Sequence, residues 1–106
     1  MTSEERLQKL QEMEAQKPND VFLKYAIALE YVNAKNDAAA QQIFESLVKT
    51  FPDYIATYYQ LGKLHERNAM NQKAITIYQA GIELAKKTND RKNLGELNEA
   101  IMMMEE

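Results

Sequence analysis

The chain is poor in the residues that build most enzymatic and metal sites. Its 106 residues include no cysteine, one histidine and three glycines. Without cysteine the chain has no disulfide framework and no thiolate nucleophile, and a lone histidine, His65, leaves no set of ligands for zinc. Gly62, Gly81 and Gly95 stand apart from one another, so no glycine-rich loop is available to hold a phosphate group. We therefore expect no catalytic residue, no bound metal and no cofactor.

Long apolar runs and an excess of positive charge are also missing. No segment approaches the roughly 20 apolar residues that a transmembrane helix needs. The opening MTSEERLQKL is charged and lacks the apolar core of a signal peptide. A net charge of -3 provides little attraction to nucleic acid. The composition predicts a cytoplasmic protein that binds neither nucleic acid nor membrane.

The sequence contains a repeat of 34 residues. Its two prolines, Pro18 and Pro52, are separated by that distance. A fixed period of this size is typical of stacked supersecondary units. Residues of the same kind recur at this offset along the chain, among them Tyr25 and Tyr59, Ala40 and Ala74, Ile43 and Ile77, and Phe44 and Tyr78.

Each repeat unit is predicted to fold as helix–turn–helix, because its apolar residues recur at intervals of three and four. In the first unit the two helical patterns are separated by NAKND, residues 33–37. We expect Asn36 to end the first helix in a left-handed conformation and Asp37 to cap the second. In the second unit the corresponding segment is NAMNQ, where we expect Asn71 to be the cap.

Helices are also expected at both ends of the chain. Thr2 and Glu5 have the spacing of a capping box at the start of a first helix. Leu94, Leu97 and Ile101 have the spacing of an amphipathic last helix. The sequence thus predicts about six helices and no strand. We expect one all-α domain with an N-terminal capping helix (1–17), a first repeat (18–51), a second repeat (52–88) and a C-terminal capping helix (89–106).

The residue types within each unit resemble the tetratricopeptide repeat, whose pattern is W-x2-L-G-x2-Y…A-x3-F…P. The resemblance implies an α-solenoid of stacked antiparallel helical hairpins. Lys24 departs from the aromatic start of the pattern, and no proline closes the second unit. The matching residues are Ile27, Ala28, Tyr31, Ala40, Phe44 and Pro52 in the first unit, and Tyr58, Leu61, Gly62, His65, Ala74 and Tyr78 in the second.

The resemblance also explains why a glycine, Gly62, stands inside a predicted helix. Glycine inside a helix costs about 1 kcal/mol relative to alanine, so we expect a close approach between two helices at this position. Large residues such as Phe44 and Tyr78 would fill the space beside the small ones. His65 occupies the tyrosine position of the pattern and is expected in the core.

The resemblance implies a non-catalytic adaptor that binds a peptide or helix of a partner protein. In this family the first helix of each hairpin lines a concave groove. Lys63 and Arg67 would orient an acidic group of the ligand. Its apolar side chains would contact Phe22, Tyr25, Leu29 and Tyr59. The last helix would add Lys92, Glu99, Met102 and Met103. The predicted groove residues are Phe22, Tyr25, Leu29, Val32, Asn33, Tyr59, Lys63, Glu66 and Arg67.

One specialisation of the family is not expected. Its chaperone-binding members hold a C-terminal carboxylate with Lys, Asn and Arg side chains. Here Tyr25 and Leu29 replace the lysine and asparagine of the first groove helix, and Gln60 replaces the asparagine of the second groove helix. Lys92 fits the pattern, but Glu96 stands where arginine belongs and would repel a carboxylate.

Self-assembly is the alternative to partner binding. Met102, Met103 and Met104 follow one another, so a helix cannot cover all three within its own core. The last helix would then dock a second copy through Met102 and Met103, as a homodimer. An RNA-binding helical repeat is a third class, which the net charge of -3 argues against.

Overall fold

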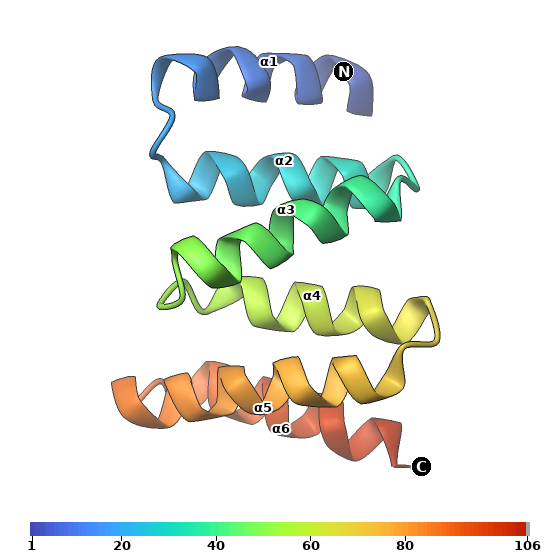
Figure 1. Ribbon diagram of the computed structural model, residues 1–106, viewed down its shortest axis with the longest axis vertical. Helices are drawn as coiled ribbons and strands as arrows, with labels where there is room; N and C mark the ends of the chain where they lie inside the picture. Colours follow the sequence, from blue (N-terminus) through green and yellow to red (C-terminus); the bar gives the residue numbers. More distant parts are fainter. Residues whose placement is uncertain (106) are drawn as a thin grey trace. The chain divides into compact units, whose positions relative to one another are not determined.

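Six α-helices make up the protein in a computed structural model that describes residues 1–105 (Figure 1). That part of the chain contains no strand, and the predicted all-α fold is confirmed. None of these helices is long and apolar enough to cross a membrane. The helices are α1 (Ser3–Gln16), α2 (Val21–Asn33), α3 (Asp37–Thr50), α4 (Ala56–Arg67), α5 (Asn71–Thr88) and α6 (Arg91–Met104).

The chain divides into two compact units. The first, Met1–Pro52, holds α1 to α3, and the second begins at Asp53 and holds α4 to α6. In the first unit α2 packs against both α1 and α3, and in the second α5 packs against both α4 and α6. The pairs α2–α3 and α4–α5 are antiparallel hairpins (Figure 1).

The turns inside the two hairpins have the same backbone geometry. Lys35 and Ala69, 34 residues apart, adopt left-handed conformations with φ of 62° and 60°. In the first turn the amide of Asn36 donates to the carbonyl of Tyr31 at 2.9 Å, and in the second that of Met70 donates to His65 at 2.8 Å. These bonds define a Schellman motif, which satisfies the last carbonyl groups of a helix.

This geometry corrects three predictions about the turns. Asn36 is not left-handed, because the Schellman motif places that conformation one residue earlier. Asn36 is instead the N-cap of α3, and its side chain accepts a hydrogen bond from the amide of Ala39 at 3.2 Å. Asp37 and Asn71 are therefore the first helical residues rather than caps, and Met70 precedes α5 without a side-chain cap bond.

Ion pairs join α1 to α2, and Leu7 and Leu10 of α1 are half-buried. No residue of α1 is buried, although its start carries the predicted capping box of Thr2 and Glu5. Arg6 Nε lies 3.0 Å from Glu30 Oε2 and Lys24 Nζ lies 2.7 Å from Glu14 Oε2. Salt bridges with solvent access contribute little each, so α1 is the least firmly packed helix of the first unit.

Gly62 lies against Tyr78 of the neighbouring helix, and the predicted close approach is confirmed. A Cβ atom added at Gly62 would sit 2.1 Å from Cε1 of the buried Tyr78 ring. Gly81 is similarly enclosed, since its added Cβ would lie 2.8 Å from Cβ of Tyr58. Gly95 differs, because an added Cβ would meet nothing within 4 Å. His65, only 4% exposed, lies in the core as expected.

The same substitution at two helical glycines should have opposite effects. Gly62→Ala should lower the free energy of unfolding by about 1–3 kcal/mol, because the Tyr78 ring must move. Gly95→Ala should raise it by about 1 kcal/mol, because alanine favours the helix and nothing obstructs its methyl group. Urea unfolding followed by circular dichroism measures both changes. Shifts in the same direction would contradict the packing at Gly62.

Replacing Ala69 by glycine should stabilise the second hairpin. A left-handed conformation costs an L-residue roughly 1–2 kcal/mol and costs glycine almost nothing. Part of that gain is offset by the greater freedom of glycine in the unfolded chain, which leaves about 1 kcal/mol. The control is Ala80→Gly in α5, which should destabilise by about 1 kcal/mol. A loss of stability at position 69 as well would contradict the turn geometry.

Candidate functional site

Tyr59 and Lys63 lie one helical turn apart on α4 and contact each other. The Lys63 Nζ atom is 5.4 Å from the centroid of the Tyr59 ring, within the range of a cation–π interaction. The same Nζ atom lies 3.6 Å from Oε2 of Glu66. The charge of Lys63 is thus compensated within its own helix.

Glu66 connects α4 to the core. The hydroxyl of the buried Tyr78 donates a hydrogen bond to Glu66 Oε2. Burial of the hydroxyl, and then its bond to Glu66, raise the pKa of Tyr78 well above its usual value, so the group stays protonated and remains a donor. The Tyr78 ring also lies 6.3 Å from the Tyr59 ring, measured between centroids. Glu66 therefore links α4 to Tyr78 of α5, and its predicted place in a binding groove stays a prediction.

A hollow of about 220 Å³ lies between α4 and α6. Ala100, only 3% exposed, is its most deeply buried residue. Positions 96, 99, 100 and 103 share one face of α6 because they follow the three- and four-residue intervals of a helix. We call it the α4–α6 hollow, and it is lined by Tyr59, Lys63, Glu96, Glu99, Ala100 and Met103.

The start of α6 is fixed by a strong cap. The Asp90 carboxylate accepts hydrogen bonds from the Asn93 side chain at 2.7 Å and from its backbone amide at 3.1 Å. These bonds stabilise the charged form of Asp90 and lower its pKa. The preceding residue, Asn89, has a φ of 58° and ends α5. This turn sets where α6 begins, and hence which of its residues reach the hollow.

The hollow brings together some of the predicted site residues and leaves others out. Tyr59 and Lys63 of α4 line the hollow together with Glu99 and Met103 of α6. Arg67 and Met102 do not line the hollow. Glu96, which the sequence marked only as unfavourable to a carboxylate ligand, also lines the hollow, and its interval of three from Glu99 was the available signal.

The two adjacent methionines of α6 are both largely exposed. Met102 is 65% and Met103 is 59% exposed. Neighbouring positions on a helix point about 100° apart, so only Met103 faces the hollow. The two side chains therefore present apolar surface in two directions.

The other five predicted groove residues lie on α2 in the first unit. Phe22 is 59% exposed, and Asn33 is exposed at the end of the helix. Tyr25 is half-buried, with its ring 6.0 Å from that of Phe44 between centroids, so it also serves the core of the hairpin. Leu29 and Val32 are half-buried. The assignment of these residues to a binding surface stays a prediction.

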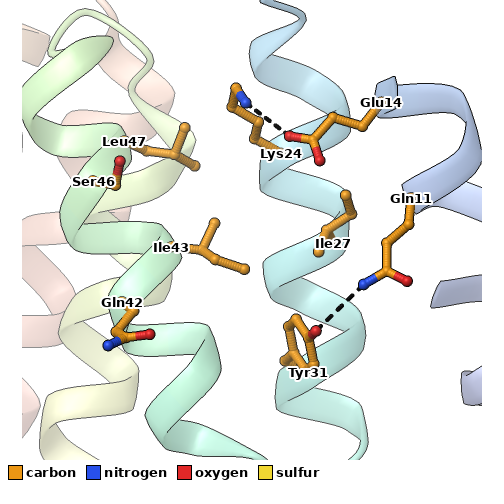
Figure 2. Close-up of a pocket in the computed structure, with 9 residues that line it drawn as sticks. All are labelled: Gln11, Glu14, Lys24, Ile27, Tyr31, Gln42, Ile43, Ser46 and Leu47. Carbon is orange, nitrogen blue, oxygen red and sulfur yellow. Dashed lines mark hydrogen bonds and ion pairs between the residues drawn. The ribbon is translucent and has the colours of Figure 1, made fainter. Parts of the chain in front are cut away.

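The first unit also has a hollow, which no pattern in the sequence indicated (Figure 2). It lies between α1 and α3 with α2 beneath, and Ile27, Ile43 and Leu47 form its apolar surface. On one side it is bounded by the Glu14–Lys24 ion pair and by Gln11, whose side-chain amide donates to the Tyr31 hydroxyl at 3.4 Å.

The hairpins define a class of protein built from stacked helical repeats. A profile of the tetratricopeptide repeat family matches residues 20–54, which include the whole of α2 and α3. No curated protein matches the chain.

Solved structures show the family over most of the chain. A solution NMR structure of a tetratricopeptide repeat domain protein from Salinibacter ruber is 44% identical, with a TM-score of 0.78, over 81% of this chain and 87% of that one. A crystal structure of a tetratricopeptide repeat domain protein from Salinibacter ruber is also 44% identical, with a TM-score of 0.78, over 82% and 97% of the two chains. The protein belongs to the tetratricopeptide repeat family, as the sequence predicted.

A third structure supports the fold alone. The solution structure of a Bordetella parapertussis protein is 20% identical and covers 92% of this chain and 84% of its own, with a TM-score of 0.80. Tetratricopeptide repeats generally mediate protein–protein interaction and generally act as non-catalytic scaffolds.

Proposed function

We propose that this protein is a non-catalytic adaptor that binds a segment of a partner protein, with an apolar side chain of that segment in the α4–α6 hollow. The observation that carries the proposal is the placement of Tyr59 and Met103 on two helices around one hollow. The general role of the family supports it.

The residues around the hollow suit this task physically. Tyrosine supplies a large contact area at low cost in conformational entropy, and methionine adapts to apolar ligands of different shapes. Fully burying a methionine side chain contributes about 1.5–3 kcal/mol, and Met103 is 59% exposed without a ligand. A partner side chain that covers Met103 therefore gains a substantial part of that energy.

The first unit would also contact the partner segment, through the exposed aromatic ring of Phe22 on α2. Phe22 is a large apolar side chain with 59% of its surface exposed. Aromatic residues are enriched among those that dominate binding energy at protein interfaces. Phe22 is accordingly proposed as the anchor of the first unit, with Tyr25 beside it one turn further along α2.

Removing the Met103 side chain should weaken peptide binding. Random 12-residue peptides selected on the immobilised protein supply the ligands, and calorimetry measures their dissociation constants. Met103→Ser should weaken them by about tenfold or more, the effect expected for a central contact. Met13→Ser is the control, since Met13 lies on α1 and is 52% exposed. Equal effects of the two substitutions, or no selectable peptide, would contradict the proposed site.

A second candidate function is self-association through α6, favoured by the exposure of both Met102 and Met103. An isologous interface would cover both side chains at once. In this case light scattering over a hundredfold range of concentration should show a dimer, and Met102→Glu with Met103→Glu should restore the monomer. A monomer at every concentration would exclude this function and leave the partner-binding proposal in place.

A further inference from the structure

We infer that the partner segment received by the α4–α6 hollow carries a lysine or arginine about one helical turn from its apolar side chain. This inference rests on the proposed function and specifies its ligand. It reverses the prediction from sequence, in which Lys63 and Arg67 orient an acidic group. The reversal follows from where each charge lies.

The positive charge at the hollow is already engaged. Lys63 Nζ lies 3.6 Å from Glu66 Oε2 and over the Tyr59 ring. An acidic ligand would have to compete with Glu66, which the Tyr78 hydroxyl holds in place. Arg67 is outside the lining of the hollow. An acidic partner group is therefore disfavoured at this position.

Two carboxylates of the hollow have no such compensation. Within residues 1–105, neither Glu96 nor Glu99 has an ion pair. Lys92, one turn before Glu96, is exposed and is not among the residues that line the hollow. Because Lys63 is paired with Glu66, the carboxylates of Glu96 and Glu99 give the lining of the hollow a net negative charge. A cation fits this surface.

A bound metal ion does not account for these carboxylates. In the described part of the chain, no group of three or more histidine, cysteine, aspartate or glutamate side chains could hold a metal. The carboxylates also adjoin apolar surface, which a hydrated metal ion would not use. A peptide cation attached to an apolar neighbour uses both parts of the site.

The spacing along α6 sets the spacing in the ligand. Glu99 precedes Met103 by four residues, and side chains at that interval on a helix are about 5–6 Å apart at Cβ. In a helical ligand a similar distance separates residues three or four apart. In an extended ligand it separates residues two apart, at about 3.3 Å per residue. A partner with Leu, Met or Phe at such an interval from Lys or Arg can place its apolar side chain against Met103 and its positive charge beside Glu99 at the same time.

Selection of peptides tests this composition directly. Random 12-residue peptides are selected on the wild-type protein and on a Glu96→Lys, Glu99→Lys variant, and both pools are sequenced. The wild-type pool should be enriched in Lys or Arg near Leu, Met or Phe. The variant should prefer Asp or Glu, and it should bind the wild-type peptides about tenfold more weakly at low salt. The affinity for the wild-type protein should fall as salt rises.

A second double variant controls for net charge. Glu12→Lys with Glu45→Lys changes the net charge equally but places the new lysines on α1 and α3, where both glutamates are exposed. It should leave the selected sequences unchanged. The inference is overturned if both double variants change binding equally, or if the selected peptides need Met103 but carry no basic residue, an outcome that would leave the proposed function standing. Failure to select any peptide dependent on Met103 would overturn both.

Discussion

The fit of Tyr78 against Gly62 is the contact on which the second unit depends. The ring fills the space that a side chain at Gly62 would need, so α4 and α5 approach closely at this point. The Tyr78 hydroxyl then reaches Glu66 on α4 and keeps that carboxylate at the helix surface. Glu66 in turn faces the Lys63 ammonium group. One buried aromatic residue thus combines the packing of the hairpin with the placement of its surface charges.

That arrangement decides which charges and apolar groups the proposed binding surface presents to a ligand. Because Lys63 is engaged by Glu66 and Tyr59, the hollow between α4 and α6 is governed by Glu96, Glu99 and apolar surface. Exposed charges contribute modestly to affinity in water but strongly to the choice of partner. The apolar contacts would supply most of the binding energy, and the two carboxylates would decide which segments are accepted.

In the first unit, apolar burial is concentrated in the α2–α3 hairpin, whereas α1 contributes ion pairs and no fully buried residue. Its hairpin has fully buried residues such as Phe44 and Ala40, whereas α1 buries none and is joined to α2 by ion pairs and a hydrogen bond to Tyr31. On the α1 side, the hollow between α1 and α3 is lined by the polar side chains of Gln11 and Glu14 (Figure 2). Polar attachment leaves space that apolar packing would have closed.

The amino-acid pattern was sufficient to predict the helices, the repeat and the close packing at Gly62. Periodicity and small-residue positions are local properties, and they report directly on helical packing. The left-handed residue of the first turn was predicted one position too late, at Asn36, because Lys35 carries no preference for that conformation and the Schellman hydrogen bonds impose it. Two features come only from the tertiary structure: the hydrogen bond from Tyr78 of α5 to Glu66 of α4, and the position of Glu96 of α6 on the same hollow as Lys63 of α4. Each depends on how residues of different helices come together, and a pattern along one helix does not contain that information.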